Sequence, residues 1–152
     1  MSNVKISEVI AHLESMAPKA YQESYDNSGL ITGNGNTPVR GVMVTLDCTE
    51  AVVQEAIDQQ CNLIVAHHPI LFKGIKKLSG HDYVTRTLIK AIKNDVAIYA
   101  IHTNLDHVHN GVNKKICDRI GLVNTSILVP RTDTLGKLTT FIPVNDVDAV
   151  IQ

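Results

Sequence analysis

The sequence predicts an α/β domain built on a mainly parallel sheet with helices on both faces. Three short apolar runs, rich in β-branched residues, are typical of buried strands, and each precedes a segment with helical spacing of its apolar residues. The runs span 42–46, 62–66 and 96–101, and the helical segments span 49–60, 85–94 and 112–120. This alternation is typical of parallel βαβ units, in which ligands bind beyond the carboxyl ends of the strands.

The segment before the first predicted strand contains a helix and a turn-rich stretch. Apolar residues recur at steps of three and four from Ile6 to Met16, and Pro18 ends the predicted helix. Residues 26–38 are dense in Gly and Asn, which predicts loops or a hairpin.

Local signals define the ends of the central helices. Thr49 is a candidate N-cap for the helix at 49–60, and Gly121 closes the helix at 112–120. Beyond these units, residues 137–142 (KLTTFI) alternate as a half-buried strand, and residues 145–152 resemble the start of a helix.

Composition is that of a globular protein with one domain's worth of chain. Of 152 residues, 44% are hydrophobic and 19% charged, and the formal net charge is −1. This balance gives no reason to expect nucleic acid or a membrane as a partner. Three scattered cysteines without a close pair, and an N-terminus without an apolar signal region, favour a cytoplasmic location.

Two adjacent histidines, His67 and His68, follow the buried strand at 62–66 and are candidate metal ligands. Side chains alternate along an extended strand, so neighbouring histidines can serve two ions a few ångströms apart only if the alternation relaxes there. Pro69 restricts His68 to extended geometry. The alternative is that the pair merely ends the strand without binding an ion.

A second cluster, IHTNLDHVHNG at 101–111, follows the last buried strand. Asp106 supplies a carboxylate that can bind a divalent ion, or it can cap the following helix. His102 is the candidate catalytic residue, either as a proton shuttle or by holding Asp106 in place. His107 and His109 suit a solvated loop better than a metal site, and the isolated His12 and His81 are surface residues by the same reasoning.

Lysines after the histidine pair give a weaker signal. Lys73, Lys76 and Lys77 could meet a phosphate, and a solvated basic turn is the simpler interpretation. The glycines at 33 and 35 lack the strand-before, helix-after context of a dinucleotide loop.

Three blocks resemble the Nif-three-like family, whose members are named GTP cyclohydrolase I type 2 homologues. They are YDNSGLITG at 25–33, AHHPILFKGIKKL at 66–78 and IHTNLDHVHNGVN at 101–113. Tyr25 stands where the family usually has tryptophan. The resemblance implies the first lobe of a two-lobed α/β fold at residues 1–130, and the start of a truncated inserted α+β domain at 131–152.

The resemblance also implies a ligand set and an assembly. It assigns His67, His68 and Asp106 to a centre of two divalent ions (Zn, Fe, Mn or Ni), which a His-x-x-x-Glu pair would complete. No counterpart of that pair occurs in this sequence, so incomplete occupancy is expected here. Family members commonly form homo-oligomeric hexamers.

These expectations lead to two functional hypotheses. The first is a metal-dependent hydrolase of the GTP cyclohydrolase I type 2 kind, with a nucleotide as substrate. The second is a non-catalytic metal-binding scaffold or regulatory interaction protein, in which ions hold lobes or subunits together. The two differ in whether GTP is consumed when metal is bound.

Overall fold

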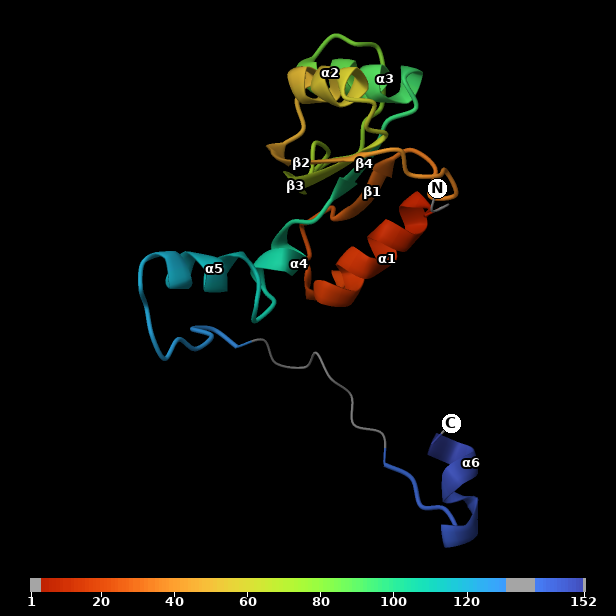
Figure 1. Cartoon of the computed structure of the whole chain (residues 1–152), viewed down its shortest axis with the longest axis vertical. Coiled ribbons are helices and arrows are strands. Elements are labelled where there is room, and N and C mark those ends of the chain that lie inside the picture. The colour runs from red at the N-terminus through yellow and green to blue at the C-terminus, as the bar shows by residue number, and fades with distance from the viewer. Residues whose placement is uncertain (1–3, 131–138, 152) are drawn as a thin grey trace.

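A computed structural model describes residues 4–130 and 139–151 (Figure 1). Its centre is a four-stranded sheet in the order β1-β4-β3-β2, with helices on both faces. The strands are β1 (Gly29–Thr32), β2 (Val42–Asp47), β3 (Leu63–His68) and β4 (Ala97–Ala100). The helical elements are α1 (Ile6–Met16), η1 (Lys19–Tyr21), α2 (Glu50–Asp58), α3 (Tyr83–Lys93), α4 (Thr103–Asp106), α5 (Val112–Arg119), η2 (Val144–Asp146) and α6 (Val147–Ile151). The predicted fold class is confirmed.

Strands β2, β3 and β4 are parallel, as the sequence predicts. Helix α2 connects β2 to β3, and α3 connects β3 to β4. The side chain of Thr49 accepts a hydrogen bond from the Val52 amide, so the predicted N-cap of α2 is present. Asp82 caps α3 in the same way through the Thr85 amide. These crossovers place the carboxyl ends of all three strands at one edge of the sheet.

The sheet separates two apolar cores. Helices α2 and α3 cover one face, where Val53, Leu88 and Ile98 are buried together. Helix α1 covers the other face, where Ile6 packs with Tyr99. Tyr99 is fully buried, and its hydroxyl donates to Glu14 on α1 at 3.4 Å. Burial first, and the neighbouring Glu14 second, raise the pKa of Tyr99.

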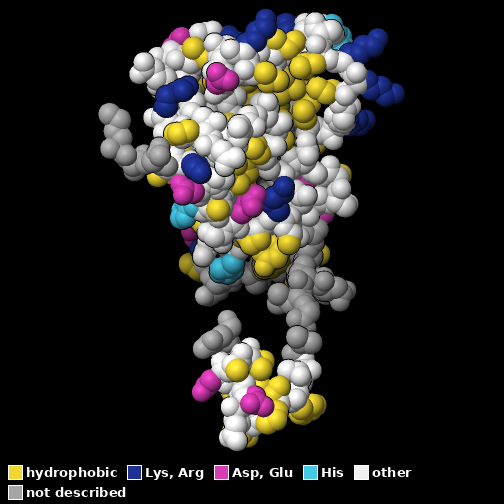
Figure 2. All heavy atoms as spheres, turned by 90° about the vertical axis from the view of Figure 1, so that its right-hand side faces the viewer, with side chains coloured by type: hydrophobic (Ala, Val, Ile, Leu, Met, Phe, Trp, Pro, Cys, Tyr) yellow, Lys and Arg dark blue, Asp and Glu magenta, His cyan; other side chains and the backbone are white. Residues whose placement is uncertain are grey.

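The predicted burial of the strand at 42–46 on both faces is wrong. Strand β2 is the sheet edge, and Val42, Val44 and Leu46 are 41%, 79% and 59% exposed. The α1 face of the core contains residues of β3 and β4 and none of β2, so these alternate side chains have no cover among the described residues. Figure 2 views the molecule from the right-hand side of Figure 1 and shows apolar side chains gathering near the top, beside Lys and Arg side chains.

The sequence predicts loops or a hairpin at 26–38. Within that stretch, β1 instead pairs with β4 in antiparallel orientation. The pairing contains an irregularity between Leu30 and Thr32, and Gly33 follows with φ +106°. A Cβ on Gly33 would lie 2.7 Å from the Cα of Ala97. Glycine therefore allows both the backbone conformation and the close approach of β1 to β4.

The C-terminal region agrees in part with the sequence. Residues 139–142 are not in a strand, and the remainder of the strand predicted at 137–142 lies outside the described residues. The predicted helix near the C-terminus is present as η2 and α6. The predicted domain boundary between 130 and 131 lies where the undescribed residues begin, and it stays a prediction. Across the described part of the chain, the helices are too short or too polar to cross a membrane.

Replacing Gly33 by alanine tests the close approach of β1 to β4. We expect Gly33→Ala to lower the free energy of unfolding by about 1–3 kcal/mol, because the methyl group overpacks against Ala97 in a strained conformation. The control is Gly74→Ala, where an added Cβ meets nothing within 4 Å. Urea denaturation measures the stability of both variants. Equal unfolding midpoints for the two would contradict the close approach of β1 to β4.

Candidate metal site

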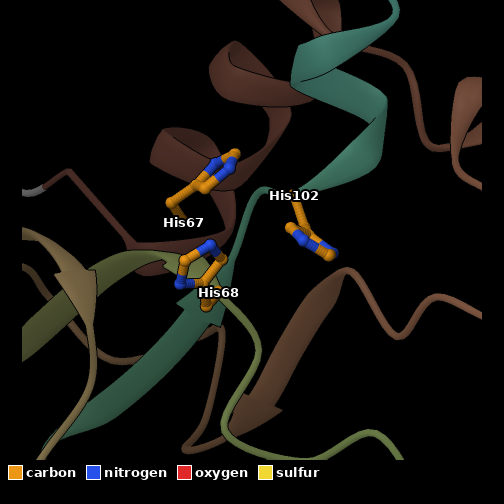
Figure 3. A group of neighbouring side chains, drawn as sticks. All are labelled: His67, His68 and His102. Atoms are coloured by element: carbon orange, nitrogen blue, oxygen red, sulfur yellow. The ribbon is translucent and has the colours of Figure 1, made fainter. Parts of the chain in front are cut away.

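Three histidines meet where β3 and β4 end. His67 and His68 are the last residues of β3, and His102 follows β4 immediately before α4 (Figure 3). Their ring centroids lie 4.9 to 5.5 Å apart, and one nitrogen from each ring lies within 4.8 Å of the others. The prediction that side chains from the two clusters converge is confirmed for these three.

The two adjacent histidines converge although the strand does not end before them. Strand β3 extends through His68, because His68 pairs with Asp47 at the end of β2. The predicted end of the strand at Ala66 is therefore two residues early. The rings of His67 and His68 nevertheless lie close together, with centroids 4.9 Å apart and an interplanar angle of 50°.

Each histidine has an acceptor at its Nδ1 atom. Nδ1 of His67 lies 3.0 Å from the carbonyl oxygen of Ile101. Nδ1 of His68 lies 2.8 Å from Oδ1 of Asp47, and Nδ1 of His102 lies 2.9 Å from Oδ1 of Asp26. Carbonyl and carboxylate oxygens only accept, so Nδ1 is the donor in each of these contacts and Nε2 is the ring nitrogen left for a metal ion. This arrangement is characteristic of metal-binding histidines.

Asp26 is the most firmly held of these acceptors. Its side chain is fully buried, and it accepts hydrogen bonds from His102, Thr103 and Ser28 and from the backbone amide of Asn27. Burial alone raises the pKa of this carboxyl, but the hydrogen bonds outweigh burial and lower the pKa to about 2. Asp26 is therefore ionised at neutral pH and fixes the orientation of the His102 ring.

Asp106 lies beside His67 but is not among the ligand atoms that meet within 4.8 Å in the described part of the chain, which belong to the three histidines. Its Oδ1 is 3.8 Å from Nε2 of His67, which is close to the spacing of two donors on one ion. The alternative that Asp106 caps the next helix is wrong, because Gly111 is the N-cap of α5. Asp106 instead ends α4, and its carbonyl accepts from Nδ2 of Asn113. It also borders an open cavity of about 1030 Å³ formed with α5 and the segment 125–130.

The remaining histidines lie outside the cluster. His107 binds the Tyr21 carbonyl through Nδ1 and lies 3.4 Å from Glu23, and His81 pairs with Asp82. His12 and His109 are exposed. In the described part of the chain, the group of potential ligands that meets within 4.8 Å contains none of these four.

Sequence reasoning missed two residues of the candidate site, Asp26 and Asp47, whose carboxylates contact His102 and His68. Asp47 follows the end of a predicted strand, so the rule that drew attention to the histidines applies to it equally. Asp26 lies in the block at 25–33 that supports the family resemblance. For His102, the structure gives Asp26 as the side-chain partner, and its predicted catalytic role stays a prediction.

Comparisons with known proteins agree on one family. A family model described as Duf34/NIF3 (NGG1p interacting factor 3) matches residues 4–152. A GTP cyclohydrolase 1 type 2 homolog from Staphylococcus epidermidis is 41% identical over 147 residues, which are 95% of this chain and 39% of that protein. The chain thus spans about two fifths of the length of the curated relatives it matches.

Solved structures show the same likeness. A Bacillus cereus protein related to NIF3 aligns with a TM-score of 0.82 at 42% identity, covering 86% of this chain and 36% of that one. Reduced HcgD from Methanocaldococcus jannaschii aligns with a TM-score of 0.76 at 29% identity, covering 86% of this chain and 51% of that one.

Removing the carboxylate behind His68 tests whether these acceptors support metal binding. We expect Asp47→Ala to weaken binding of a divalent ion by roughly 10–100-fold, because the freed ring loses its orientation and basicity. Since the Asp47 side chain is 61% exposed, the thermal unfolding midpoint should change little. Competition with a chromophoric chelator measures the affinity.

The control for Asp47 is Asp58→Ala, the same change at an exposed position on α2. It should leave metal affinity unaltered. Equal affinities for the Asp47 variant and the unaltered protein would show that the contact with His68 has no supporting role.

Proposed function

Because the chain belongs to the Duf34/NIF3 family, we propose that His67, His68, His102 and Asp106 form one part of a divalent-metal centre. The observation that carries the proposal is that the three rings converge and that each has an acceptor at Nδ1. Each Nδ1 lies against an acceptor, and one nitrogen from each ring lies within 4.8 Å of the others. Three converging imidazoles with a nearby carboxylate are a donor set that suits a divalent transition-metal ion.

The spacing of the donors favours two ions. Nitrogen and oxygen ligands lie about 2.0–2.2 Å from zinc, so donors to one ion are separated by roughly 3–4 Å. The 3.8 Å between His67 and Asp106 fits one ion, whereas Asp106 does not join the histidine nitrogens that meet within 4.8 Å, so a second ion would be shared by the histidines. Imidazole and carboxylate donors suit Zn, Fe, Mn or Ni.

The remaining ligands of such a centre would come from elsewhere. Four protein donors shared by two ions leave several coordination positions for water or for further side chains. Because the chain spans about two fifths of the length of its curated relatives, we place the missing donors in the part of the family fold that this chain does not cover. The His-x-x-x-Glu pair implied by the sequence resemblance is the candidate.

The proposed activity is metal-dependent hydrolysis of the GTP cyclohydrolase type. Divalent ions at this position would lower the pKa of a water molecule and make it nucleophilic at neutral pH. The chain's own contribution is orientation, because Asp26 and Asp47 hold two of the rings. The name shared by the curated relatives supports GTP as the first substrate to test.

Loss of a proposed ligand should remove both metal and activity. We expect His67→Ala and Asp106→Ala to reduce metal retention after desalting more than Asp47→Ala does, because they remove donors themselves. We also expect them to abolish any metal-dependent turnover of GTP. Elemental analysis and chromatography of the nucleotide are the measurements, and His81→Ala is the control because His81 is exposed and pairs with Asp82.

Two outcomes would contradict parts of this proposal. Metal retained equally by the His67 and Asp106 variants would overturn the site itself. Retained metal with GTP unchanged over hours would overturn the hydrolase and favour the scaffold, in which the ions hold lobes or subunits together.

A further inference from the structure

The loop between β3 and α3 brings an exposed aromatic ring to the histidine cluster. Every residue from Phe72 to Ser79 is exposed. The ring of Phe72 nevertheless lies edge-on to His102, with centroids 5.7 Å apart and an interplanar angle of 78°. Because Phe72 is 51% exposed, about half of its surface is open for contact with a ligand beside the candidate metal ligands.

The start of this loop is tied to the segment that supports the site. Nδ2 of Asn27 donates to the carbonyl oxygen of Leu71 at 2.9 Å. Asn27 is the neighbour of Asp26, whose carboxylate holds His102. The position of Phe72 is thus fixed by the same segment that orients the ring it touches.

The loop is also the basic part of this region. Between Asp58 and Asp82 the sequence has no Asp or Glu, whereas Lys73, Lys76 and Lys77 follow Phe72 closely. These lysines give the stretch a formal charge of +3, so the rest of a chain with net charge −1 carries −4. Within residues 4–130 and 139–151 these three ammonium groups have no hydrogen bond or ion pair.

We propose that this loop recognises a small anionic ligand that carries a planar unsaturated ring. The ring packs against Phe72, since an aromatic surface binds another planar ring through stacking or edge contacts. The lysines attract and hold the anionic group as flexible point charges. The inference rests on the proposed function, because it places this ligand beside the metal centre.

A protein partner is the rival occupant of the loop. Ile75 and Leu78 are 44% and 46% exposed and would suit such a surface. The contact between Phe72 and His102 favours the small ligand, because it places the loop beside the candidate metal ligands at the carboxyl end of the sheet.

Three probes separate the ring from the charge. Phenyl phosphate carries both features, inorganic phosphate carries only the anion and phenol carries only the ring. In ligand-observed NMR titrations of the metal-loaded protein, we expect phenyl phosphate to bind at least about fivefold more tightly than either of the others. Phe72→Leu should remove the advantage over inorganic phosphate and leave the affinity for inorganic phosphate unchanged.

Replacing the lysines should affect both phosphate probes, in contrast to replacing Phe72. The triple variant K73Q/K76Q/K77Q should bind phenyl phosphate and inorganic phosphate about tenfold more weakly at low ionic strength, with the difference shrinking as salt screens the charges. The matched control K93Q/K115Q/R119Q makes the same change in net charge on α3 and α5. It should retain most of the affinity.

Metal content, measured on every sample, separates this inference from the proposed function. If the protein holds metal but binds phenyl phosphate no better than inorganic phosphate, or if Phe72→Leu has no effect, the ligand assignment of the loop is overturned. A control triple that weakens binding as much as the loop triple overturns the role of these lysines. If the unaltered protein binds no metal, both this inference and the proposed metal centre are overturned.

Discussion

The site depends on the parallel register of β2, β3 and β4. The ladder pairs Asp47 with His68, so β2 and β3 end together, and it pairs Ala66 with Ala100, so β4 ends two residues earlier. The last residues of β2 and β3 and the residues that follow β4 therefore share one edge of the sheet. The register also puts the Ile101 carbonyl opposite His67, where it accepts the Nδ1 proton. A shift of one residue would turn each strand's side chains to the opposite face and separate the donors.

The group that accepts the Nδ1 hydrogen bond differs among the three histidines. A neutral carbonyl holds His67, whereas carboxylates hold His68 and His102. Of the two carboxylates, Asp26 is fully buried and Asp47 is largely exposed. Asp26 reaches His102 because β1 packs antiparallel on β4, which in turn requires a glycine at position 33. A turn far from the histidines in sequence thus helps to orient one of them.

Charge and apolar surface are distributed around the site in complementary ways. Aspartates at positions 26, 47 and 106 lie close to the candidate metal ligands, where bound cations would balance them. Three lysines, at positions 73, 76 and 77, lie in the neighbouring loop together with the exposed ring of Phe72. The proposed centre thus places cation-binding side chains next to a loop suited to an anionic ring compound.

The sequence by itself determined the α/β class, the bounds of α1, the Thr49 cap and the histidine pair, because periodicity and capping are local properties of the chain. It also directed attention to the carboxyl ends of the strands, where the site lies. Only the tertiary structure decided that β2 is an exposed edge, that residues 29–32 join the sheet as β1, and that His102 shares the cluster while Asp26 and Asp47 hold its rings. These features come from pairings between residues up to 76 positions apart, and such contacts leave no periodic pattern in the sequence.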